Sequence, residues 1–221
     1  MSTQLEAVYG YLRELKAHND RGWFEAHRGE YEQAKRAFED FVQDLTLRFD
    51  PIEPLSGAPP KDFVMRIYRD VRFSKDKSPY RTSFAASFAR GGKKSHRLPY
   101  YVHLEPEGSF LAGGVYMPDA AQLKRIRAVI AEDSREIRAI VGARAFTRYF
   151  DALSGSQLKT APKGYAVDAP DIDLLRRTQF LAVHAVSESQ VCDSGFSKHV
   201  IAVFAAMRPF NEYFNRVLGL A

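Results

Sequence analysis

The chain has 221 residues, of which 45% are hydrophobic and 27% charged, with a formal net charge of +5. This composition is ordinary for a globular protein that buries a sizeable core, and it holds no repeat or low-complexity tract. One cysteine, Cys192, excludes an internal disulfide, and no apolar run approaches the roughly 20 residues of a membrane helix, so we expect a cytoplasmic chain without membrane association.

The first fifty residues are predicted to be helical. Apolar residues recur at helical spacing over 4–17 and again over 28–49, with a short helix around Trp23 between them. Asp20 is a suitable N-cap for that short helix. A loop rich in Pro and Gly, 51–60, then leads into the next part of the chain.

The middle part, 61–117, is predicted to form the core of a sheet. Apolar and polar residues alternate, as in half-buried strands, in four runs: 63–69, 84–90, 100–106 and 109–116. The last two runs form a hairpin through a tight turn at Glu107-Gly108. The pair Gly113-Gly114 indicates a bulge or a close approach by another group.

The last part, 118–221, is predicted to hold helices and one further strand. The helices are expected from Pro118-Asp119, from Ser134, over 145–153 and over 197–218 with a kink near Pro209, and the strand is expected over 179–186. The whole chain, 1–221, is therefore predicted to be a single α+β domain, with an antiparallel sheet of about five strands packed with N- and C-terminal helices.

The basic character of the chain is local. The segment 61–97 holds eleven Lys and Arg against three Asp, a net charge of +8, while the rest of the chain sums to −3. Such a concentration points to a surface that meets anions.

The stretch RIYRDVRFSKDKSPYRTSFAASFARGGKK, 66–94, resembles the pattern of domain-of-unknown-function family 2461. Three further stretches are similar to that family: 15–31, 100–119 and 207–218. The resemblance covers nearly the whole chain in order, although 187–197 matches only loosely. It implies one compact domain and brings no activity, substrate or cofactor, so whether the chain is an enzyme stays open.

A cluster of cations between the first two predicted strands has two interpretations. Its members are Arg69, Arg72, Lys75, Lys77 and Arg81. They form an anion clamp, in which Asp70 and Asp76 orient the arginines, or a solvated loop with internal ion pairs.

The predicted strands also carry polar residues. Arg66 and Tyr68 share one face of their strand, and Tyr101, His103 and Glu105 share one face of another. Together they line a binding cleft, with His103 or Glu105 as a general base, or they form the wet side of the sheet.

Two other kinds of site are not expected. His103 and Glu105 project the same way, but no third metal ligand stands at motif spacing, so we predict no metal site. Cys192 has no neighbour that would activate it, so we predict a dispensable thiol.

Three functions fit the basic segment. The favoured one is binding of a phosphate- or carboxylate-bearing small molecule, because Asp70, Asp76 and Glu105 would repel a polyanion. The second is nucleic-acid binding. It adds Arg90, Lys93, Lys94 and Arg97. The third is interaction with an acidic protein partner.

Overall fold

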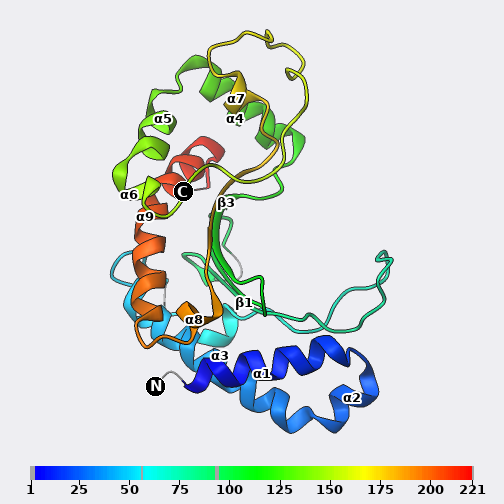
Figure 1. Ribbon diagram of the computed structural model, residues 1–221. Helices are drawn as coiled ribbons and strands as arrows, with labels where there is room; N and C mark the ends of the chain where they lie inside the picture. The colour runs from blue at the N-terminus through cyan, green and yellow to red at the C-terminus, as the bar shows by residue number, and fades with distance from the viewer. Residues whose placement is uncertain (1–2, 56, 93–94, 221) are drawn as a thin grey trace. The chain divides into compact units, whose positions relative to one another are not determined.

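The computed structural model describes residues 3–55, 57–92 and 95–220, which fold as α+β (Figure 1). The helices are α1 (Thr3–Ala17), α2 (Arg21–Ala26), α3 (Arg28–Phe49), the 3₁₀-helix η1 (Pro60–Asp62), α4 (Ala120–Glu132), α5 (Arg135–Gly142), α6 (Arg144–Thr147), α7 (Ile172–Leu175), α8 (Glu188–Val191) and α9 (Phe196–Leu218). The strands are β1 (Phe84–Phe88), β2 (Tyr100–Leu104), β3 (Phe110–Val115) and β4 (Phe180–Ala185), and they form an antiparallel sheet in the order β1-β2-β3-β4.

The chain divides into two compact units. Unit 1 consists of Met1–Ser95, Tyr101–Leu111 and Ala185–Ala202, and unit 2 consists of His96–Tyr100, Ala112–His184 and Val203–Ala221. The expectation of a single domain stays a prediction.

Most of the predicted elements are confirmed within a few residues. The strands predicted over 84–90, 100–106, 109–116 and 179–186 are β1 to β4. The helix predicted over 145–153 was too long, because the chain loosens after Thr147 into a turn in which Tyr149 N and Phe150 N both donate to Phe146 O. Helix α9 continues through Pro209, and the kink there stays a prediction.

The strand predicted over 63–69 was wrong. This segment bridges β1 only at Val64, opposite Ala86, and then pairs at Tyr68 with Tyr80 of the returning chain. The change of partner breaks the ladder, and Pro79, next to Tyr80, has no N–H to extend it. Residues 66–81, which we call the arm, therefore leave the sheet as two extended legs, the teal loop of Figure 1.

The base of the arm is held by the corner between α1 and α2. The Asn19 side chain donates from Nδ2 to Tyr80 O at 3.0 Å and accepts from Tyr80 N at 3.1 Å. The Phe24 ring of α2 stacks on the Tyr80 ring with centroids 4.0 Å apart. Asp20 caps α2 by accepting from Trp23 N at 3.0 Å, as its position predicted. Polar and aromatic contacts thus fix one leg of the arm to the corner between α1 and α2.

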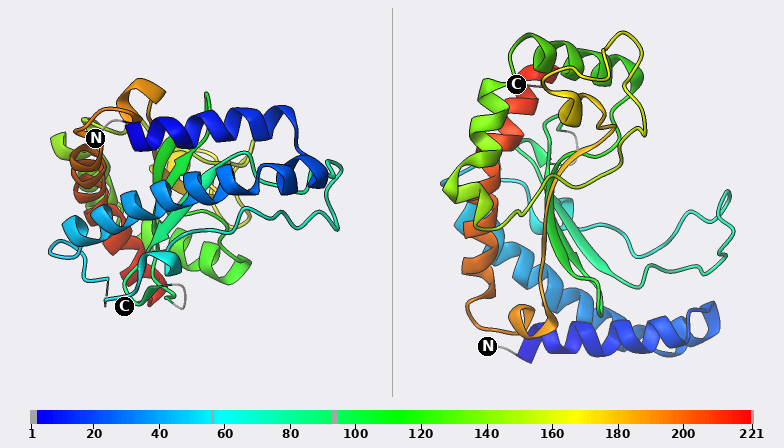
Figure 2. Two further views of the ribbon diagram at one scale, coloured as in Figure 1. Left: turned by 90° about the horizontal axis from the view of Figure 1, so that it is seen from below. Right: turned by 45° about the horizontal axis from the view of Figure 1, so that its top comes forward.

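The core of unit 1 lies between helices and β1. Helices α1 and α3 pack side by side (Figure 2), and Leu12, Leu15, Phe38 and Leu45 are fully buried. The Phe38 ring lies 5.4 Å from that of Phe84 on β1. The helical spacing of these apolar residues explains why one face of each helix is dry.

In unit 2, two glycines let α9 and β4 approach the main chain of β3. A Cβ on Gly113 would lie 2.2 Å from Met207 Sδ of α9. A Cβ on Gly114 would lie 2.2 Å from Phe180 O of β4, and Gly114 has φ +104, which favours glycine. The predicted close approach is therefore confirmed.

Replacing Gly114 by Ala should lower the free energy of unfolding by about 3 kcal/mol, because it adds backbone strain to a backbone clash. Urea denaturation measures this loss. Gly142→Ala is the matched control in unit 2, since a Cβ there meets nothing within 4 Å, and its effect should stay within about 0.5 kcal/mol. Equal stabilities for the two variants would contradict the account.

Candidate functional site

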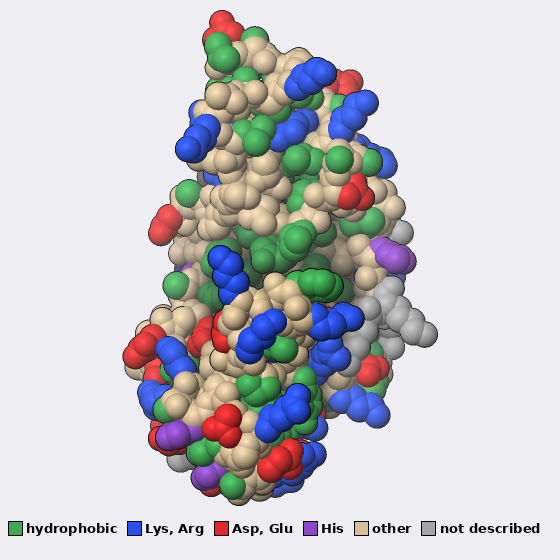
Figure 3. Space-filling model, turned by 90° about the vertical axis from the view of Figure 1, so that its right-hand side faces the viewer, with side chains coloured by type: hydrophobic (Ala, Val, Ile, Leu, Met, Phe, Trp, Pro, Cys, Tyr) green, Lys and Arg blue, Asp and Glu red, His purple; other side chains and the backbone are tan. Residues whose placement is uncertain are grey.

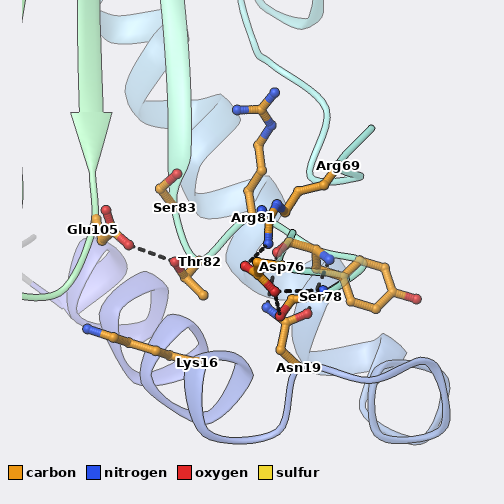
Figure 4. Close-up of a pocket in the computed structure, with 10 residues that line it drawn as sticks. Lys16, Asn19, Arg69, Asp76, Ser78, Arg81, Thr82, Ser83 and Glu105 are labelled. Carbon is orange, nitrogen blue, oxygen red and sulfur yellow. Dashed lines mark hydrogen bonds and ion pairs between the residues drawn. The ribbon is translucent and has the colours of Figure 1, made fainter. Parts of the chain in front are cut away.

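A polar hollow of about 370 Å³ lies at the base of the arm, and we call it the arm-base hollow (Figure 4). All of its residues belong to unit 1. They are Lys16 and Asn19 from α1 and the corner after it, Arg69, Asp76, Ser78, Tyr80 and Arg81 from the arm, Thr82 and Ser83 before β1, and Glu105 after β2.

One side of the hollow is an ion pair inside the arm. Asp76 Oδ1 accepts from Ser78 N at 2.9 Å and from Ser78 Oγ at 2.6 Å, while Oδ2 pairs with Arg69 Nη1. The hydrogen bonds from Ser78 and the pair with Arg69 hold the pKa of Asp76 well below its usual range. The charge of Arg69 is therefore largely neutralised.

The opposite side carries Glu105. Its Oε1 accepts from Thr82 Oγ1 at 2.6 Å, and its Oε2 lies 3.1 Å from His103 Nε2. Burial acts to raise the pKa of Glu105. The hydrogen bonds from Thr82 and His103, together with the charges of His103 and Lys16, outweigh burial and lower it. Glu105 is therefore an ionised acceptor at neutral pH.

The predicted alternation on β2 is confirmed. Val102 and Leu104 are buried, whereas Tyr101, His103 and Glu105 are only partly buried. Tyr101 Oη lies 3.3 Å from His103 Nδ1. The Phe110 ring stacks on the His103 ring at 4.7 Å, so His103 is fixed between polar neighbours and a ring.

Two cations of the hollow keep their charge available. Lys16 Nζ lies 3.9 Å from Glu107 Oε2, and both side chains are more than half exposed, at 52% and 89%. Among the described residues nothing bonds to the Arg81 guanidinium, which stands apart from Asp76 in Figure 4. Such weakly paired cations are able to accept an anionic ligand.

The structure brings only part of the predicted site together. Arg69, Arg81 and Glu105 line the hollow. Arg66, which the sequence predicts as part of the site, is exposed and lies outside the hollow. Tyr68 is 46% exposed and packs on Tyr80 at 5.6 Å.

Farther out on the arm, the cations follow the solvated-loop interpretation in part. Arg72 donates to Asp70 from Nε at 3.0 Å and from Nη2 at 2.7 Å. Lys77 Nζ donates to Val71 O at 3.0 Å. Lys75 is exposed, without a bonded partner in the described part of the chain.

The structure describes two of the four further cations that the nucleic-acid hypothesis adds. Arg90 is exposed in unit 1, and Arg97 of unit 2 donates to Glu212 at 2.5 Å. Lys93 and Lys94 lie outside the described residues.

The sequence analysis did not identify six residues of the hollow: Lys16, Asn19, Ser78, Tyr80, Thr82 and Ser83. Lys16 ends an amphipathic helix, where a cation is common, and Asn19 reads as a helix stop. Their role depends on a tertiary contact with the arm, for which the local sequence carries no signal.

A second cavity, of about 480 Å³, lies between α1, α3 and the segment 191–198 of unit 1. Cys192 lines it beside Phe41, Phe196 and Lys198. Burial, with the nearby charges of Glu188 and Glu6, raises the pKa of the Cys192 thiol. The thiol is therefore protonated at neutral pH.

In the described ranges, no three His, Cys, Asp or Glu side chains gather in a way that could hold a metal ion. None of the helices in those ranges combines the length and apolarity that crossing a bilayer requires.

Comparison with protein families assigns residues 7–213 to the family described as "Conserved hypothetical protein (DUF2461)", and the chain belongs to that family. No curated protein and no solved structure matches the chain.

The hydrogen bond from Thr82 predicts the acid response of Glu105. Because the folded pKa of Glu105 is lowered, its ionised form stabilises the fold above the unfolded pKa of roughly 4, and this contribution is lost as pH falls through the folded value. Thr82→Val should raise the folded pKa and cost about 1 kcal/mol at pH 7. Carboxyl NMR titration and urea unfolding between pH 3 and 7 measure both. Thr147→Val, which removes a hydroxyl bonded only to Ala143 O, is the control, and an unchanged Glu105 pKa in Thr82→Val would refute this role.

Cys192 should be dispensable and slow to react. Cys192→Ser should change the free energy of unfolding by less than about 1 kcal/mol, since the side chain is only half-buried. The wild-type thiol should react with Ellman's reagent slowly at pH 7 and faster as pH rises. Rapid stoichiometric reaction at pH 7 would show an activated thiol instead.

Proposed function

We propose that the arm-base hollow binds a small molecule that carries a phosphate or carboxylate group. The observation that supports this most is the pair of cations, Lys16 and Arg81, which line one polar hollow. Lys16 has a long, exposed contact with Glu107 at 3.9 Å, and no bonded partner of Arg81 is found among the described residues. The hollow has about 370 Å³, which is within the range of small-molecule sites.

The chemistry of the lining suits an oxyanion. The Arg81 guanidinium offers a planar fork of donors for two oxygens, and Lys16 adds a compact charge from α1. The hydroxyls of Thr82 and Ser83 lie on the same lining and supply neutral hydrogen bonds.

Glu105 adds a second requirement. Its ionised carboxylate lines the same hollow and would repel a ligand made only of anionic groups. A ligand with a hydroxyl or amine beside its anionic group would donate to Glu105 while Lys16 and Arg81 hold the anion. The preferred class is therefore a hydroxylated or amino-bearing phosphate or carboxylate.

The site supports binding rather than a named reaction. The lowered pKa makes Glu105 a weak proton acceptor near neutral pH, where a general base is most effective with a pKa near 7. The alternatives, nucleic acid and an acidic protein, would use the outer cations of the arm, because a hollow of this size admits only a small group.

Phosphate should raise the melting temperature of the wild type. With a dissociation constant of about 1 mM, 10 mM phosphate stabilises the folded state by about 1.4 kcal/mol, a rise of roughly 3 °C for a chain of this length. Sodium chloride at matched ionic strength corrects for screening. Arg81→Met and Lys16→Met should each remove most of the rise.

Arg66→Met is the matched control, because Arg66 is an exposed arginine of the same segment outside the hollow. It should leave the phosphate effect unchanged. A flat melting temperature across phosphate, sulfate and glycerol phosphate would eliminate the proposed function. Loss of the effect in Arg66→Met alone would move the anion site to the part of the arm outside the hollow.

A further inference from the structure

The outer part of the arm, residues 70–77, which we call the outer arm, carries an aromatic ring in full contact with solvent. Phe73 is 95% exposed, whereas the other aromatic residues of the arm, Tyr68 and Tyr80, are 46% and 4% exposed. The Arg72 guanidinium lies 5.8 Å from the centre of the Phe73 ring. Two planar groups thus stand together at the turn of the arm, where nothing in unit 1 covers the ring.

The cations of the arm lie along both of its legs. Arg66, Arg69 and Arg72 stand on the outgoing leg, and Lys75 follows a turn closed by the hydrogen bond from Ser74 N to Val71 O. With Lys77 and Arg81 against Asp70 and Asp76, the arm carries a net charge of +4. A concentration of like charges on a projecting segment suits a polyanion.

The acidic residues of the arm are already bonded within it. Asp70 accepts two hydrogen bonds from Arg72, and Asp76 is held by Arg69 and Ser78. Arg66 and Lys75 remain without a bonded partner in the described part of the chain, and Lys77 uses one donor on Val71 O. The repulsion that Asp70 and Asp76 would exert on a polyanion is therefore reduced.

We propose that the outer arm binds single-stranded nucleic acid, with Phe73 stacking on a base and the cations Lys75 and Lys77 contacting phosphates. Stacking on an exposed ring beside a basic track is the general mode of sequence-tolerant single-strand binding. Figure 3 views the molecule from the side toward which the arm projects, and Lys and Arg side chains are spread over that face.

Two other anionic partners suit the outer arm less well. A membrane surface would favour several apolar side chains together, but Phe73 stands between Arg72 and Ser74, with Lys75 next. A protein interface is usually depleted of Lys, whereas Lys75 and Lys77 stand close to Phe73 in the chain. This inference is independent of the arm-base hollow, because Phe73, Lys75 and Lys77 do not line it.

Fluorescence anisotropy of a labelled 20-nucleotide oligothymidylate with the full chain, between 50 and 200 mM salt, tests the proposal. Phe73→Ala should weaken binding about tenfold at every salt concentration. The double variant Lys75→Gln, Lys77→Gln should reduce the slope of log affinity against log salt by about 1.4, since each phosphate contact contributes about 0.7.

Tyr116→Ala is the matched control, because Tyr116 is an aromatic residue of unit 2 that is 64% exposed and lies outside the arm. It should bind as the wild type does. The phosphate effect on melting should survive in Phe73→Ala, which separates this proposal from the proposed function. The inference is overturned by absent binding at 50 mM salt, by equal binding of Phe73→Ala, or by equal Phe73-dependent binding to phosphatidylserine vesicles or polyglutamate.

Discussion

The side-chain amide of Asn19 bonds to both main-chain polar groups of Tyr80, a residue 61 positions later in the chain. A carboxylate could not donate and a hydroxyl is too short to span both groups, so the amide acts here as a strand partner would. This contact fixes the returning leg of the arm against the corner after α1. It therefore sets where Arg81 stands relative to Lys16, three residues before Asn19, and the arm-base hollow depends on it.

Ion pairing divides the basic segment into parts with different chemistry. Where an aspartate lies within reach, as for Arg69 and Arg72, the cation is neutralised and shapes the arm. Where none does, as for Arg81, the charge remains available to a ligand. Net charge alone does not show this division, because it depends on which side chains meet within the folded arm, as Arg69 meets Asp76 of the other leg.

The elements that the sequence predicted well depend on local patterns. The alternation of apolar and polar residues predicted β1 to β4, because each of these strands stays in one sheet along its whole length. The same rule failed over 63–69, where the partner changes from Ala86 to Tyr80 within four residues. The concentration of Lys and Arg in the segment 61–97 predicted Arg69 and Arg81 as site residues. The alternation of apolar and polar residues over 100–106 predicted Glu105. Lys16 and Asn19 could not be found, because a contact across 61 residues leaves no periodic trace.

The two glycines of β3 limit which substitutions the packing between β3 and α9 tolerates. At Gly113 and Gly114 the strand offers main chain alone to Met207 and Phe210 of α9, so it contributes no volume that could adjust. A smaller residue in place of Phe210 leaves a void that no side chain at Gly114 is able to fill, because Phe180 O and the positive φ also exclude one. Changes in the packing against Gly114 can therefore be compensated only between positions of α9, whereas a smaller residue in place of Met207 removes the closest contact of a Cβ on Gly113.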